Sequence, residues 1–188
     1  IYTLSLHDAL PILAYMNIAG EIEHTGRLNI LANHGTLTLD GKITANDGAT
    51  RNDRMTYAIA RSGADGMVLG EHLNVVNMQN DGYRPAGTSK NVGVWFRNKG
   101  NNGLTMANGA SIVVDEQMVE LQNYKGDMTV NGKVQSESAG LVVINNKDTA
   151  NKLTVGSTAD INKTKGTYTN WAQTEIWQEA KIGRASCR

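Results

Sequence analysis

Histidines and carboxylates are the residue types of this chain that could ligate a metal ion or carry acid–base catalysis. His24, His34 and His72 lie in unrelated sequence contexts, and the chain has no His-x-x-x-His spacing, cysteine pair or Gly-x-Ser-x-Gly string. We therefore interpret these histidines as turn or surface residues. The acids that could form a catalytic or calcium-binding cluster are Asp40, Asp47, Asp53, Asp65, Asp115 and Glu116.

None of these acids recurs at a fixed interval beside an arginine or lysine, and an aspartate in an Asn-Asp-Gly string is ordinarily a turn former. The stretch GADGMVLGE lacks the strict Gly-Gly-x-Gly-x-Asp recurrence of a calcium-binding repeat. The sequence therefore predicts a protein that is not an enzyme, with no catalytic residue, metal or cofactor.

The two ends of the chain differ from the sequence between them. Residues 3–12 resemble one translated frame of a short-read sequencing adapter, and residues 182–188 resemble a frame of its reverse complement. We therefore interpret residues 1–12 and 182–188 as non-native sequence, which is excluded from fold reasoning as a tag would be. Residues 13–181 are expected to be an internal fragment of one domain.

Composition between these flanks favours short strands and turns. Residues 13–181 hold no cysteine and one proline, Pro85, with 16 Lys and Arg against 17 Asp and Glu. Such a balance gives no electrostatic basis for binding nucleic acid or an anionic membrane. No run reaches the roughly 18 apolar residues of a membrane span. Abundant Gly, Asn and Thr are typical of strands joined by tight turns.

A short pattern recurs along residues 13–181: apolar, Thr or Asn, apolar, any residue, Gly, any residue, then Ile or Val. It occurs as MNIAGEI, LTLDGKI and MTVNGKV, with looser copies LTMANGASI and LTVGSTADI. A weaker candidate, LNVVNMQ, begins at Leu73. Apolar and polar residues alternate before a Gly or Asn turn, which predicts strand, tight bend and strand.

A second recurrence shares the same period. Phe96, Leu121 and Ile144 recur at nearly equal spacing, in the strings FRNKG, LQNYKG and INNKD. Leu104, Met128 and Leu153 of the first pattern recur at nearly the same spacing. A period of about 24 residues with two or three strands per unit predicts one coil of a parallel β-helix, in which each coil buries its apolar face on the next. A β-sandwich does not explain this shared step.

Asparagines also align at this period. Asn98, Asn123 and Asn146 predict a ladder in which each side-chain amide bonds to the equivalent amide one coil away. The alternative is that these asparagines simply favour turns. The predicted core positions are Leu37, Leu39, Phe96, Leu104, Leu121, Met128, Val130, Ile144, Leu153 and Val155.

Outward-facing positions follow from the same alternation. Trp95 is expected to face outward because Phe96 is expected in the core. Lys99, Lys125 and Lys147 follow the aligned asparagines and form either a basic stripe or an ordinary solvated face. Polar, Gly-rich stretches near residues 46–56 and 79–91 are predicted to be loops that leave the coils and could carry binding.

Repeat units such as GTLTLDGKI and GDMTVNGKVQSESAGLVVIN, with no cysteine and scarce proline, resemble the passenger region of bacterial type V autotransporters and related adhesins. The resemblance covers residues 16–161. It implies an all-β fold, a right-handed parallel β-helix (β-solenoid) with coils of about 24 residues and looped insertions. Lack of cysteine agrees with it, because a disulfide formed in the periplasm would obstruct export.

Function follows from that resemblance as an expectation. The segment would be a stalk on the surface of a Gram-negative cell that presents binding loops to a host-cell, matrix or bacterial ligand. The parent chain would end in an outer-membrane barrel, and no nucleic acid would be a partner. The alternatives are a polysaccharide-degrading β-helix enzyme, which needs acids and cations clustered on adjacent coils, and a phage tail-fibre or tailspike segment.

Overall fold

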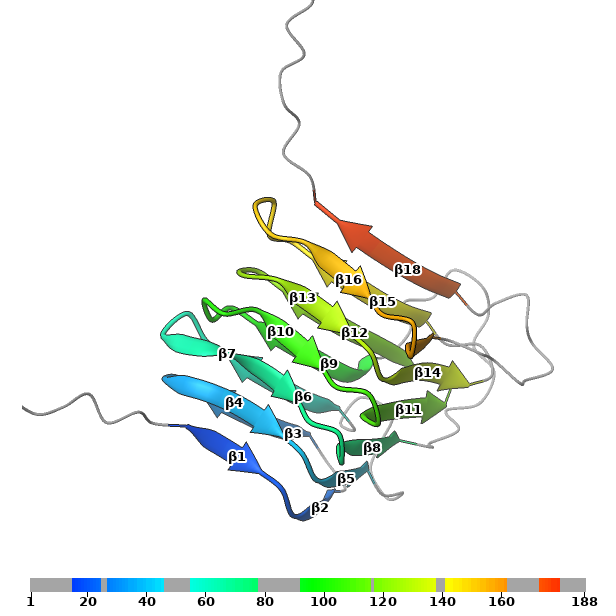
Figure 1. The fold of residues 1–188 in the computed structure, drawn as a ribbon. Coiled ribbons are helices and arrows are strands. Elements are labelled where there is room, and N and C mark those ends of the chain that lie inside the picture. The colour runs from blue at the N-terminus through cyan, green and yellow to red at the C-terminus, as the bar shows by residue number, and fades with distance from the viewer. Residues whose placement is uncertain are drawn as a thin grey trace, which may run out of the picture.

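The computed structural model describes residues 15–24, 27–45, 55–77, 92–115, 117–137, 141–161 and 173–179. These residues form strands and no helix, so none of their elements is a helix able to cross a membrane. Figure 1 shows the strands stacked from β1 (Met16–Ile18) at one end to β18 (Gln173–Gln178) at the other.

The strands form three parallel sheets of six strands each, and every coil contributes one strand to each sheet. Sheet A contains β1, β4 (Gly35–Leu39), β7 (Ala64–Leu69), β10 (Leu104–Met106), β13 (Met128–Val130) and β16 (Leu153–Val155). Sheet B contains β2 (Glu21–His24), β5 (Lys42–Ala45), β8 (Asn74–Asn77), β11 (Ser111–Asp115), β14 (Lys133–Glu137) and β17 (Asp160–Ile161). Sheet C contains β3 (Leu28–Ala32), β6 (Thr56–Ala60), β9 (Val92–Asn98), β12 (Met118–Asn123), β15 (Leu141–Asn146) and β18. The prediction of a parallel β-solenoid is confirmed at this level.

Alternation along each strand builds the core. In β4 the side chains of Leu37 and Leu39 are fully buried, whereas Thr36 and Thr38 on the other face are half-buried. Side chains of one strand lie above their equivalents in the next, because the parallel register pairs Leu37 with Met67. The result is one continuous apolar column enclosed by the three sheets.

The predicted core positions differ in burial only at the last described coil. Eight of them are 0 % exposed: Leu37, Leu39, Phe96, Leu104, Leu121, Met128, Val130 and Ile144. Leu153 is partly buried against this core, and Val155 is 42 % exposed where the sequence predicts a core residue. Both belong to β16, which ends sheet A within the described residues, so no described strand covers their outer side.

Register corrects one repeat assignment. Met67 pairs with both Leu37 and Leu104, so the coil between them begins with β7 and the prediction that it begins at Leu73 is wrong. Leu73 instead lies after the turn, immediately before β8, and its side chain is buried. The true repeat, MVLGEHLNV, has Val68 at the usual Thr position and two extra turn residues. These differences conceal its start at Met67, and the sequence that begins at Leu73 fits the repeat pattern by coincidence.

Glycines allow the coils to approach closely where sheet C turns into sheet A. Gly103 and Gly126 have φ values of 88° and 76°, in the left-handed region that glycine tolerates. A Cβ atom on Gly103 would lie 2.0 Å from the backbone oxygen of Asp127 in the next coil. The amide of Leu104 donates to this same oxygen at 3.1 Å. A side chain at position 103 would therefore disturb the stacking of two coils.

Candidate functional site

The structure brings the three predicted ladder asparagines together inside the solenoid, on successive strands of sheet C. Asn98 pairs with Asn123, and Asn123 pairs with Asn146, in the parallel register. Nδ2 of Asn98 donates to Oδ1 of Asn123 at 2.8 Å, and Nδ2 of Asn123 donates to Oδ1 of Asn146 at 3.0 Å. All three side chains are 0 % exposed. We call these three residues the asparagine ladder.

A fourth residue extends the ladder. Nδ2 of Asn146 donates to Oε1 of Gln178 in β18 at 2.9 Å. The repeat pattern does not predict Gln178, because this residue differs in type from the asparagines and lies further along the chain than the regular period would place it. The register of β15 with β18, which pairs Asn146 with Gln178, would have been needed to find it.

The same amides also close the turns that follow each strand. Nδ2 of Asn98 donates to the backbone oxygen of Gly100 at 3.0 Å, and Oδ1 of Asn98 accepts from the Gly100 amide at 3.0 Å. Nδ2 of Asn123 donates to the backbone oxygen of Gly126 at 2.7 Å. Buried amides that are hydrogen-bonded in this way stabilise a specific register and offer no chemistry to a ligand. The ladder is therefore a structural feature.

The outer face of sheet C carries a different group of side chains, which we call the sheet C patch. Because Val94, Phe96 and Asn98 of β9 point inward, the alternating positions 95 and 97 point outward. The patch comprises Tyr57, Trp95, Arg97, Lys99, Glu120, Gln122, Tyr124 and Lys147. The register places Tyr57 beside Trp95 and Trp95 beside Glu120.

Arg97 lies at the centre of this patch. Its guanidinium carbon is 4.0 Å from the centroid of the Trp95 ring, a cation–π contact. Its Nε donates to Oε1 of Gln122 on the next strand at 2.8 Å. The Trp95 ring also contacts Tyr57, with 5.4 Å between centroids and 55° between planes. These contacts hold the guanidinium in one orientation on the sheet.

Two lysines and Arg97 gather around a single tyrosine. The Nζ atoms of Lys99 and Lys147 lie 5.6 Å and 5.4 Å from the Tyr124 ring centroid, and the guanidinium carbon of Arg97 lies 5.7 Å from it. The backbone amide of Tyr124 donates to the backbone oxygen of Asn98, and that of Lys147 donates to the backbone oxygen of Asn123. Positions 99, 124 and 147 therefore stack on successive coils. Three positive charges thus surround one aromatic ring.

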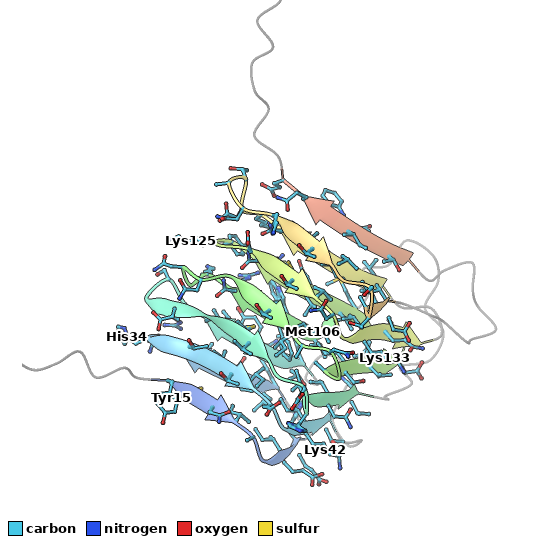
Figure 2. The ribbon with its side chains drawn as sticks, in the orientation of Figure 1. Tyr15, His34, Lys42, Met106, Lys125 and Lys133 are labelled. Carbon is cyan, nitrogen blue, oxygen red and sulfur yellow. The ribbon has the colours of Figure 1, made fainter. Side chains whose placement is uncertain are left out.

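The predicted stripe of Lys99, Lys125 and Lys147 is wrong at its middle position. Tyr124 occupies the equivalent position, and Lys125 lies one residue further along, at the turn before β13 (Figure 2). There the Nζ of Lys125 donates to Oδ1 of Asn101 at 3.3 Å. The alignment of the strings failed because LQNYKG has one more residue between its asparagine and lysine than FRNKG.

Glu120 is the carboxylate of the patch, and its side chain is half-buried. Burial raises the pKa of Glu120, while a hydrogen bond from Gln122 and the charges of Arg97 and Lys147 lower it by less. Nε2 of Gln122 donates this hydrogen bond to Oε1 of Glu120. The patch therefore gains net positive charge as Glu120 is protonated.

The histidines do not gather into a site. Nε2 of His24 lies 3.0 Å from Oγ1 of Thr56, and Nδ1 of the exposed His72 lies 3.2 Å from Oδ2 of Asp40. The hydrogen bond with Asp40 raises the pKa of His72, and the hydrogen bonds from His72 lower the pKa of Asp40. His34 lies at the turn between β3 and β4. Across the described ranges, no three His, Cys, Asp or Glu side chains are grouped to hold a metal ion.

Part of the predicted functional surface lies outside the described residues. Outside the described residues lie Asp47, Asp53, Glu116 and both predicted binding loops, except for Met55 and Thr56 at the start of β6. Asp65 lies in β7 of sheet A and Asp115 at the end of β11 in sheet B, so these two acids belong to different sheets.

Comparison with known proteins gave no match to a family model, to a curated protein or to a solved structure. The features available for assigning a function are therefore the solenoid itself and the sheet C patch.

Proposed function

We propose that residues 13–181 are a structural and adhesive segment of an autotransporter passenger, a stalk on the surface of a Gram-negative cell. The observation that supports this proposal best is the unbroken stacking of six strands in each of three parallel sheets around one apolar column. Such a stack lengthens by one strand spacing, about 4.8 Å, with every added coil. A protein built in this way provides reach and rigidity.

We further propose that the coils wind in the right-handed sense and have a basic length of about 24 residues. Right-handed connections are the usual sense between parallel strands of one sheet. The basic length is supported by β10, β13 and β16, where Leu104 pairs with Met128 and Met128 pairs with Leu153. The coil from Met67 to its partner Leu104 is longer, because it contains the polar, Gly-rich stretch near residues 79–91.

Each coil of the solenoid is stabilised by contacts with its immediate neighbours, which suits a chain that is exported unfolded and folds afterwards. Each strand pairs only with its equivalents one coil before and one coil after, so folding can begin at one end and propagate along the stack. A chain without cysteine between the flanks forms no disulfide that would have to pass an outer-membrane pore. These two properties support the proposed route and the proposed location.

Genomic DNA from the source sample, sequenced past the codon for Lys181, tests this proposal. We expect a downstream region that encodes about a dozen alternating amphipathic strands of an outer-membrane barrel. A stop codon shortly after residue 181, or adjacent phage structural genes, would overturn the proposal.

Display on cells gives a second test. The chain is placed between a signal peptide and the barrel of an unrelated autotransporter, and intact cells are treated with antibody and protease. We expect antibody binding at the surface, and the same fusion without its signal peptide is the control that stays inside. Retention of a folded chain in the periplasm would contradict the proposal.

A further inference from the structure

We propose that the sheet C patch binds an acidic polysaccharide lying along the solenoid axis, with its carboxylate or sulfate groups on Arg97, Lys99 and Lys147. This inference rests on the proposed adhesive function and names the ligand class and the surface that would serve it. It places binding on a sheet face, in addition to the predicted loops.

An excess of positive charge is the first reason, because the patch holds three cations and one carboxylate, Glu120. Arg97, Lys99 and Lys147 surround the Tyr124 ring, yet none of them forms an ion pair with a carboxylate elsewhere in the described part of the chain. The ring face attracts each cation but does not cancel its charge. An anionic group at this position would gain charge-assisted hydrogen bonds from three donors.

Preorganisation is the second reason. The Arg97 guanidinium is held against Trp95 and by Gln122, so it loses little side-chain entropy when an anion binds. The two lysines flank Tyr124 from the coils before and after it, which sets their backbone positions at about twice the strand spacing, roughly 10 Å, apart. Cations at fixed intervals along a straight axis suit a stiff polymer with regularly repeated acidic groups.

An exposed aromatic ring on the same line suits a sugar ligand. The register aligns Arg97, Gln122, Asn145 and Trp177 as one outward column across four coils. Trp177 is 54 % exposed, so its ring is accessible to the apolar face of a pyranose. Tyr124, which is half-buried, adds a hydroxyl group of a type suited to sugar hydroxyls, whereas Gln122 is buried and serves to hold Arg97.

Binding of the full chain to dextran sulfate, measured by titration calorimetry at about 0.1 M salt, where exposed charges act over about 10 Å, tests the inference. Neutral dextran and a single-stranded DNA oligonucleotide are compared under the same conditions. We expect dextran sulfate to bind, neutral dextran to give no heat, and DNA to bind more weakly. Tighter binding of DNA would overturn the assignment to polysaccharide.

Matched double variants separate the patch from the overall charge. Lys99→Gln with Lys147→Gln is expected to weaken dextran sulfate binding about tenfold or more. Lys42→Gln with Lys133→Gln removes the same charge from β5 and β14 of sheet B and is expected to change binding less than about twofold. Equal losses in both variants would overturn the inference, and unchanged circular dichroism verifies that each variant is folded.

Trp177→Ala provides an uncharged test of the same surface. We expect weaker binding of the sulfated polymer at unchanged salt dependence, because the substitution removes a stacking contact and no charge. Loss of polysaccharide binding would leave the genomic and surface-display results for the stalk unchanged, so the two proposals fail separately.

Discussion

The side-chain amide of Asn123 donates a hydrogen bond to Oδ1 of Asn146 in the next coil, 3.0 Å away in the solenoid interior. Asn123 also accepts from Asn98 on its other side and donates to the Gly126 oxygen. Each buried amide therefore finds its partner in the neighbouring coil only when the three coils stack in one register. A slip of one residue would turn these amides toward the other face of the sheet and leave the column unpaired.

Replacement of Asn123 by alanine is expected to lower the free energy of unfolding by about 2 to 3 kcal/mol. The substitution breaks the ladder in the middle and removes a hydrogen bond partner from both Asn98 and Asn146. Urea unfolding followed by circular dichroism measures the change. Asn29→Ala is the control, because Asn29 lies on the exposed face of β3, and it is expected to cost less than about 0.5 kcal/mol. Equal effects would mean that the ladder contributes nothing to the stability of the stack.

Gly103→Ala is expected to destabilise the stack by about 2 to 4 kcal/mol, since backbone strain and steric overlap add. The residue has a positive φ, and its added Cβ would overlap the oxygen of Asp127 in the neighbouring coil. Gly20→Ala is the matched control, because a Cβ at Gly20 meets no atom within 4 Å. Thermal unfolding of both variants decides the matter, and a Gly103→Ala protein as stable as the Gly20→Ala protein would contradict the close approach of these coils.

The repeat period and the alternation of apolar and polar residues were sufficient to predict the parallel solenoid and, except at Leu153 and Val155, the predicted interior positions. Phe96, Leu121 and Ile144 recur with the asparagines two positions later, and the structure pairs each of them with the next in sheet C. Such signals are visible in a sequence because a parallel stack in register puts equivalent residues on top of one another. The interior could be predicted for this reason alone.

Features that depend on turn length could not be predicted with the same accuracy. One additional residue in LQNYKG moved Tyr124 into the column where a lysine was expected, and two additional turn residues concealed the strand that contains Met67. The patch residue Tyr57 was also missed, because a long insertion separates it from its neighbour Trp95 in the sequence. Register across such variable turns is set by three-dimensional pairing, which a repeat alignment does not contain.

Phe96→Ala tests the continuity of the apolar column. The side chain is 0 % exposed, and it is the single phenylalanine of the chain. Its removal leaves a cavity between coils, and we expect a loss of about 3 to 5 kcal/mol in the free energy of unfolding. Val155→Ala, at a position 42 % exposed, is expected to cost less than about 1 kcal/mol. A similar cost for both substitutions would show that the column is loosely packed.

Binding to the sheet C patch is expected to strengthen as the pH falls from 7.5 toward 5. Burial raises the pKa of Glu120, so this carboxyl gains its proton above the ordinary glutamate pKa of about 4.3. Its negative charge lies beside Arg97 and Lys147, and protonation removes an opposing charge from the surface that would hold an anion. An anionic ligand beside Glu120 raises the pKa of this carboxyl, so by linkage the protein binds the ligand more tightly when Glu120 is protonated.

Glu120→Gln isolates this effect from every other titrating group. The variant is expected to bind dextran sulfate more tightly than the unmodified chain at pH 7.5, and the difference in affinity is expected to narrow as the pH falls toward 5, because Glu120 is protonated while the sulfate groups remain charged. The difference between the two proteins therefore reports Glu120 and leaves out the exposed His72, which titrates equally in both. An affinity difference that stays constant from pH 7.5 to pH 5 would show that Glu120 does not titrate in this range. A variant that binds no more tightly at any pH would show that the carboxylate does not face the bound polymer, and that the polymer lies elsewhere on the solenoid.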